Sequence, residues 1–177
     1  MKRCLQSHIN LSQKILEMGT GPFALLSIFL HRKYHCTVHA CDINENYVDS
    51  ALKCIKMNNS SVNVFQSDLF EHITGQYDII FFNSVYIPTA RGIADGIDRL
   101  HEHVTDWCGG RDGTESIYKF LINAKKHLLP NSKLLLGFNR SYLKEAALKK
   151  VCASCGYTLS DTCSFPLYPS LIFVLTL

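Results

Sequence analysis

Residues 13–21 have the sequence Gln-Lys-Ile-Leu-Glu-Met-Gly-Thr-Gly, an apolar segment that ends at two glycines. We predict a short buried strand and a tight turn here, because glycine lets the backbone turn sharply and approach a ligand closely. Residues 22–32 are apolar almost throughout and begin with Pro22, which suits the first turn of a helix. The stretch therefore predicts strand, turn and helix, either as a nucleotide-binding corner or as a purely structural one.

Strands and helices alternate along the rest of the chain. Short apolar runs predict strands at 37–41, 63–66, 78–82, 134–138 and 171–177. Apolar residues at helical spacing predict helices at 46–58, 116–127 and 141–153. This alternation is typical of an α/β fold in which helices cover both faces of a doubly wound, mostly parallel sheet.

Composition is that of an ordinary globular protein. The 177 residues are 47% hydrophobic and 19% charged, and the net charge of +3 does not indicate a dedicated nucleic-acid binder. The basic start Met1-Lys2-Arg3 is not followed by the apolar stretch and cleavage site of a signal peptide. The most apolar stretch, 22–30, is too short to span a bilayer. We therefore expect a cytoplasmic protein without a membrane partner.

The eight cysteines include a single C-x-x-C, formed by Cys152 and Cys155. A zinc site would need a second pair or suitably spaced histidines, and Cys163 alone does not complete one. We expect no metal site and interpret the cysteines as small buried apolar side chains.

Polar residues follow the predicted strands, at the edge where parallel α/β sheets bind ligands. Asp42 stands about 20 residues after the glycines, where a carboxylate can accept hydrogen bonds from both hydroxyls of a ribose. Its alternative role is a helix N-cap. Asp68, within Ser67-Asp68-Leu69, can accept from an adenine amino group while the next backbone N–H donates to a ring nitrogen. A turn or cap is the alternative there.

The fourth predicted strand is followed by Asn83-Ser84-Val85-Tyr86-Ile87-Pro88. The Asn83 side-chain oxygen and the Ser84 carbonyl can both accept hydrogens from one NH2 group. Tyr86 is expected to pack on the face of a planar target. The segment therefore suits the orientation of a planar amide or amine.

The order of these motifs resembles the class I S-adenosylmethionine-dependent methyltransferases. More narrowly, it is similar to the HemK/PrmC-type glutamine methyltransferases of peptide release factors, which carry N-P-P-Y-I-P where this chain has residues 83–88. Residues 107–113, Trp-Cys-Gly-Gly-Arg-Asp-Gly, resemble their G-G-x-D-G segment. The resemblance covers about residues 13–140.

The resemblance implies a Rossmann-like, mostly parallel seven-stranded sheet with an antiparallel last strand, forming one domain over residues 1–177. It implies S-adenosylmethionine as cofactor and N-methylation of a planar nitrogen, first of all in a glutamine side chain of a protein. A nucleic-acid base, a small molecule and a non-catalytic subunit of a methyltransferase complex remain alternatives, as does a partner subunit. The residues expected to bind the cofactor are Glu17, Gly19, Thr20, Gly21, Asp42, Ile43, Ser67, Asp68, Leu69 and Asn83. The residues expected to act in catalysis are Asn83, Ser84 and Tyr86.

Three features depart from the family pattern. Ser84 and Val85 replace both prolines of N-P-P-Y, and Phe23 stands where a third glycine is usual. The separate N-terminal helical domain that helps the bacterial enzymes hold their substrate is not expected here. Because proline fixes φ, its loss predicts a more flexible loop at residues 83–88. We expect cofactor binding to persist, while the methyl acceptor stays open.

Overall fold

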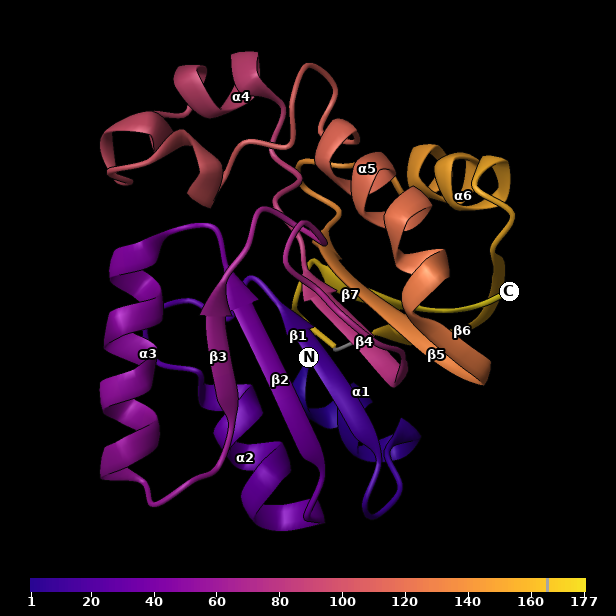
Figure 1. Ribbon diagram of the computed structural model, residues 1–177. Coiled ribbons are helices and arrows are strands. Elements are labelled where there is room, and N and C mark those ends of the chain that lie inside the picture. The colour runs from indigo at the N-terminus through magenta and orange to yellow at the C-terminus, as the bar shows by residue number, and fades with distance from the viewer. Residues whose placement is uncertain (165) are drawn as a thin grey trace. The chain divides into compact units, whose positions relative to one another are not determined.

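The computed structural model of the protein describes residues 1–164 and 166–177. The chain divides into two compact units. Figure 1 shows their helices and strands, labelled in chain order. The first unit comprises residues 1–82 and 126–135, and the second comprises residues 83–125 and 136–177.

The first unit is built on parallel strands. Strand β1 pairs with both β2 and β4, so that Ile15 lies opposite Val38 on one side and Ile79 on the other, and β2 pairs with β3. Helix α2 packs on β2, and α3 packs on β2 and β3. The elements are α1 (Lys2–His8), β1 (Lys14–Met18), α2 (Leu25–Tyr34), β2 (Thr37–Asp42), α3 (Glu45–Met57), β3 (Asn63–Gln66) and β4 (Tyr77–Asn83), which ends at the first residue of the second unit.

The second unit contains shorter helices and an antiparallel strand pair. Strands β6 and β7 pair with Thr158 opposite Thr176, and α6 packs on both β6 and α5. Its elements are α4 (Thr89–Ala94), the 3-10 turns η1 (Ile97–Arg99) and η2 (Val104–Asp106), α5 (Glu115–Ala124), α6 (Glu145–Ser154), β6 (Thr158–Ser164) and β7 (Ser170–Thr176). The 3-10 turn η3 (Lys125–His127) and strand β5 (Leu128–Asn139) contribute residues to both units.

The seven strands follow the order β3-β2-β1-β4-β5-β7-β6. The order runs outward from β1 to β3 on one side and from β4 onward on the other, which places the switch point between β1 and β4. The predicted α/β fold, with a mostly parallel seven-stranded sheet whose last strand is antiparallel, is confirmed.

Several element boundaries differ from those predicted. Helix α2 begins at Leu25 rather than at Pro22, because residues 21–23 form a turn and Ala24 adopts a left-handed φ of 47° as the N-cap. Strand β5 begins six residues earlier than predicted and includes the exposed Pro130 and Asn131, which are residue types uncommon in strands. Helix α1 and strand β6 were not predicted. Among the described residues, no helix is long and apolar enough to cross a membrane.

Candidate active site

The turns that follow β1, β2 and β3 are tied together by backbone hydrogen bonds. The N–H of Thr20 donates to the carbonyl of Cys41 at 3.0 Å, and the N–H of Ser67 donates to the carbonyl of Asp42 at 2.9 Å. The predicted cofactor residues on these three turns therefore share one edge of the sheet in the first unit.

The glycine turn after β1 needs its glycines for different reasons. Gly19 has a φ of 67°, and a Cβ there would lie 3.2 Å from the ring of Phe82. Gly21 has a φ of 64°, and a Cβ there would meet no atom within 4 Å. The first glycine thus allows close packing, and the second leaves open space beside its own N–H.

That N–H fixes the orientation of Asp42. The side chain of Asp42 is buried, its Oδ2 accepts from the N–H of Gly21 at 2.8 Å, and its Oδ1 accepts from the N–H of Asn44 at 3.0 Å. The N-cap of α3 is Asn44, whose side chain accepts from the N–H of Asn46, so Asp42 does not take the capping role. A carboxylate oxygen can accept more than one hydrogen bond, so the aligned Asp42 retains capacity for a hydroxyl ligand.

Glu17 serves the start of α2. Its buried Oε2 accepts from the N–H of Ser27 at 3.1 Å, from the Ser27 hydroxyl, and from the Thr20 hydroxyl at 3.1 Å. The Ser27 N–H is one of the first N–H groups of the helix, which have no partner within the helix itself. Glu17 therefore joins the glycine turn to α2, a role that its place at the end of a strand did not indicate.

Glu17 also predicts a pH dependence of stability. The pKa of Glu17 is raised to about 7, mainly by burial and to a smaller extent by nearby Asp42, against the lowering effect of the hydrogen bonds from Ser27 and Thr20. The ordinary pKa of a glutamate in the unfolded chain is about 4.3. At pH values between about 4.3 and 7, the folded protein therefore keeps a proton on Glu17 that the unfolded chain releases. The free energy of unfolding should therefore fall by about 2–3 kcal/mol as pH rises from 5 to 7.5.

Urea unfolding of wild type and Glu17→Gln at both pH values measures this contribution. We expect the glutamine variant to lose that part of the pH dependence, whereas Glu45→Gln, at the exposed start of α3, keeps it. An unchanged pH profile in Glu17→Gln would show that the carboxyl does not titrate in this range.

The turn after β3 is shaped by Ser67. Its buried hydroxyl donates to the carbonyl of Leu69 at 2.8 Å and accepts from the N–H of His72 at 3.1 Å. Leu69 has a φ of 46°, and Asp68 is exposed. Ser67 thus shapes the turn, and Asp68 is left available to a ligand. Ile43 is also exposed, and its carbonyl accepts from the Gln66 side chain at 3.1 Å.

In the second unit, Ser84 is held more firmly than the loss of proline suggested. Ser84 is 4% exposed, and both its N–H (3.1 Å) and its hydroxyl (2.9 Å) donate to the carbonyl of Gly137. A proline at this position could form neither bond, because it has no N–H and no hydroxyl. The serine therefore replaces a fixed φ by two hydrogen bonds to β5.

Removing the Ser84 hydroxyl should weaken the second unit. For Ser84→Ala we expect a loss of about 1 kcal/mol in the free energy of unfolding, the usual net value of one such hydrogen bond. The alanine keeps the backbone bond to Gly137, so the fold should persist. Urea unfolding measures the stability of this variant. The control is Ser154→Ala, which changes an exposed serine at the end of α6. Equal stability of the two variants would argue against an anchoring role for Ser84.

The glycine-rich segment at 109–113 packs against residues 86–89, in and just after the loop that follows β4. A Cβ on Gly109 would lie 2.8 Å from the Cα of Tyr86, and one on Gly113 would lie 2.3 Å from the Tyr86 carbonyl oxygen. The N–H of Gly109 donates to the carbonyl of Ile87 at 2.9 Å, and the N–H of Thr89 donates to the carbonyl of Gly110 at 2.9 Å. These glycines are needed for close backbone packing against residues 86–89.

Asn83 and Tyr86 present different surroundings. Asn83 is exposed, and its side chain has no hydrogen-bond partner among the described residues. Tyr86 is half-buried with its ring 6.5 Å from that of Tyr142, and burial, with a smaller effect of Tyr142, raises the pKa of its phenol. Tyr86 is thus a neutral aromatic side chain at physiological pH, and the amide of Asn83 is free to bind a ligand.

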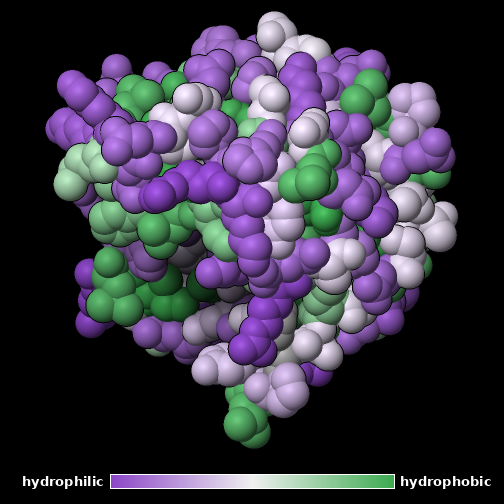
Figure 2. All heavy atoms as spheres, turned by 90° about the horizontal axis from the view of Figure 1, so that it is seen from below, coloured by the Kyte–Doolittle hydropathy of each residue, from purple (hydrophilic) through white to green (hydrophobic). Residues whose placement is uncertain are grey.

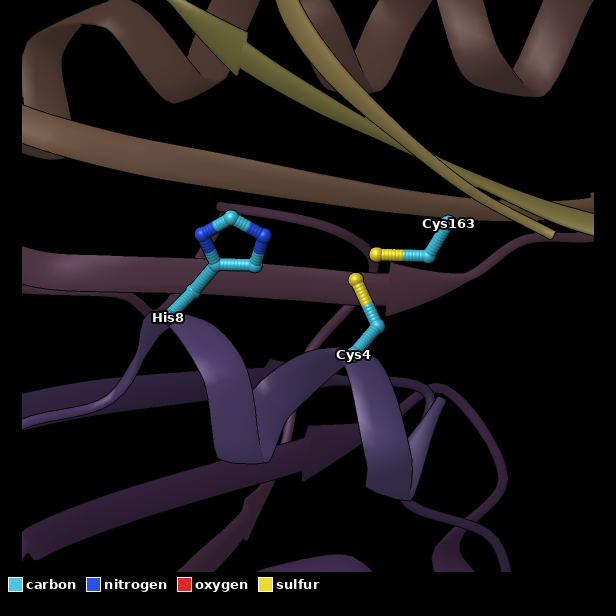
Figure 3. A group of neighbouring side chains, drawn as sticks. All are labelled: Cys4, His8 and Cys163. Atoms are coloured by element: carbon cyan, nitrogen blue, oxygen red, sulfur yellow. The ribbon is translucent and has the colours of Figure 1, made fainter.

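The cysteines of the C-x-x-C are both free and buried, as predicted. Figure 3 shows Cys4 and His8 one helical turn apart on α1, together with Cys163 of β6. In the first unit, the ammonium group of Lys133 lies 3.4 Å from Nδ1 of His8. The expectation that the chain holds no metal stays a prediction.

The fold and these turns have counterparts in known proteins. Residues 2–88 match the family described as the methyltransferase small domain. A putative protein N5-glutamine methyltransferase of Methanocaldococcus jannaschii is 35% identical over 117 residues, which cover 66% of this chain and 57% of that protein. These matches are consistent with a class I S-adenosylmethionine-dependent methyltransferase.

Two further methyltransferases match more of the chain. The release factor glutamine methyltransferase of Agrobacterium fabrum is 28% identical over 85% of this chain and 52% of its own length. A methyltransferase from Pyrococcus furiosus, at 22% identity, superposes with a TM-score of 0.73 over 97% of this chain and 77% of that structure. The chain spans about half the length of the Methanocaldococcus jannaschii and Agrobacterium fabrum proteins.

Proposed function

We propose that this chain is an S-adenosylmethionine-dependent N-methyltransferase that acts on a planar amide nitrogen, in first place the side chain of a protein glutamine. The observation that carries the proposal is the aligned, buried carboxylate of Asp42 beside the open Gly21 turn. The names of the two curated relatives support the glutamine acceptor.

The first unit would hold the cofactor. Asp42 would accept hydrogen bonds from the ribose hydroxyls, because its oxygens are oriented by Gly21 and Asn44 and retain lone pairs. Asp68 would accept from the adenine amino group, while Gly19 and Gly21 keep the turn clear of side chains. The geometry fits a nucleoside whose sulfonium group, when bound, supplies a reactive methyl.

The acceptor would be oriented by the loop that follows β4. The Asn83 side-chain oxygen and the Ser84 carbonyl would accept the two hydrogens of the target NH2 group, with Tyr86 against its planar face. This arrangement aims the nitrogen lone pair at the methyl and favours the positive charge that develops on nitrogen. The nitrogen gains the methyl and then loses one proton to solvent, so no strong base is needed.

The test is incubation with S-adenosylmethionine carrying a tritiated methyl group and a cell extract. The labelled products are then treated separately with protease and with nuclease. Label released only by protease, and recovered as methylglutamine after complete enzymatic digestion, is the expected result. Label released only by nuclease, or already in a small molecule, would overturn the glutamine assignment. Absence of label together with calorimetric binding of the cofactor would indicate a non-catalytic subunit.

A further inference from the structure

A basic surface lies on α1 and the carboxyl end of α2, both in the first unit. It consists of Lys2, Arg3, Arg32 and Lys33, which are all exposed, and we call it the α1–α2 basic surface. Figure 1 shows α1 and α2 in the indigo-to-violet, N-terminal part of the chain, and the face drawn in Figure 2 carries both strongly hydrophilic and hydrophobic side chains. The modest net charge of the whole chain conceals this local excess.

An aromatic ring holds cations of the two helices close together. The ammonium group of Lys2 on α1 lies 4.4 Å from the centroid of the Phe29 ring on α2, and that of Lys33 lies 5.7 Å from the same centroid. The two ammonium groups are therefore no further apart than the sum of these distances. Attraction to the ring offsets part of their mutual repulsion. Lys33 also lies 5.6 Å from the ring of Tyr34.

The loops that contact the end of α2 supply no balancing negative charge, and Asp78 of β4, which lies near Cys36, accepts from the N–H of Lys14 at 2.8 Å. Glu17 is the only acidic residue in residues 1–41, and its buried carboxyl is bonded at the opposite end of α2. The loops at 9–13 and 58–62, which contact the end of α2 through Ser12–Tyr34 and Ser60–His31 hydrogen bonds, contain no charged residue. Within the described part of the chain, none of the four cations forms an ion pair.

Helix stability explains only half of this surface. Arg32 and Lys33 lie in the last turn of α2, where cations interact favourably with the helix dipole. Lys2 and Arg3 belong to a different helix and have no such role at its beginning. The convergence of Lys2 with Lys33 on the Phe29 ring concentrates positive charge at a cost in repulsion, which a polyanionic partner would offset.

We propose that the α1–α2 basic surface binds the phosphate backbone of single-stranded nucleic acid. A nucleic-acid strand carries one charge about every 3.4 Å along a duplex axis, so adjacent phosphates can meet both Lys2 and Lys33. The half-buried Tyr34 ring beside them is of the kind on which bases stack. The proposal goes beyond methyl transfer and stands without it.

Fluorescence anisotropy with a labelled 20-nucleotide oligouridine, titrated with the full chain over a range of salt, tests the proposal. Four backbone contacts predict a slope of about −3 for log affinity against log salt. In the double variant Lys2→Gln/Lys33→Gln the slope should shrink by about 1.4, the effect of two lost contacts. Phe29→Leu keeps every charge, and it should weaken binding at fixed salt without changing the slope.

The matched control is Lys119→Gln/Lys150→Gln, which removes two exposed lysines from α5 and α6 in the second unit. It should keep the wild-type slope. Calorimetry with S-adenosylmethionine and thermal melting should give the same values for both double variants, which separates this surface from the cofactor site. Absence of oligouridine binding at about 50 mM salt, equal losses in both double variants, or binding to phosphatidylserine vesicles alone would overturn the proposal.

Discussion

Replacing Asn83 by alanine is expected to lower the rate of methyl transfer about 10²–10³-fold, the loss typical of removing one positioned hydrogen-bonding group from an active site. The side chain is exposed and has no hydrogen-bond partner among the described residues, so its truncation removes no hydrogen bond among them. The effect should fall on turnover, because the acceptor nitrogen loses the oxygen that orients its hydrogens. Initial rates with tritiated-methyl cofactor at saturation measure it, and calorimetry measures cofactor affinity, which should change far less than turnover.

Asn123→Ala provides the control for this experiment. Asn123 is an exposed asparagine in α5 whose side chain donates to the carbonyl of Lys119, so its loss tests the general effect of an Asn-to-Ala change in the second unit. It should leave both turnover and affinity close to wild type. Turnover near the wild-type rate in Asn83→Ala would remove Asn83 from the catalytic assignment, whatever the acceptor.

The strands could be predicted because a strand that is buried on both faces has a short run of mostly apolar residues. Three of the five residues of β1 and five of the seven of β7 are apolar, and both strands are buried over most of their length. Strand β6 has no such apolar run. Its sequence, Thr-Leu-Ser-Asp-Thr-Cys-Ser, is mostly polar and its residues are largely exposed, because the strand lies at the edge of the sheet. Helix α1 was missed because only Cys4 and Leu5 of its seven residues are buried.

Side-chain roles could be predicted where they depend on nearby backbone. Asp42 and the glycines lie on adjacent strands, so the order of strand and turn was enough to bring them together. Ser84 and Gly137 are 53 positions apart, and no local pattern indicates that the serine hydroxyl would replace a proline by bonding to β5. The bond between Glu17 and Ser27 is similarly hidden, because it depends on where α2 begins.

The first-unit site makes its strongest prediction at Asp42. Asp42→Ala should weaken S-adenosylmethionine binding at least about a hundredfold, because two hydrogen bonds from ribose hydroxyls to a charged acceptor, at roughly 1.5–3 kcal/mol each, would be lost. The N–H groups of Gly21 and Asn44 would lose their acceptor as well, so the turn itself should loosen. Isothermal titration calorimetry, at a temperature well below the melting transition of each variant, measures the affinity.

Two further variants separate ligand binding from folding. Asp42→Asn keeps one side-chain oxygen as acceptor, so it should retain more stability than alanine while still losing one ribose contact. Asp49→Ala removes an exposed carboxylate from α3 in the same unit, and it should bind the cofactor as wild type does. If Asp42→Ala were folded and bound S-adenosylmethionine with undiminished affinity, the buried carboxylate would be only a brace for the Gly21 turn. The cofactor would then have to be held by other groups.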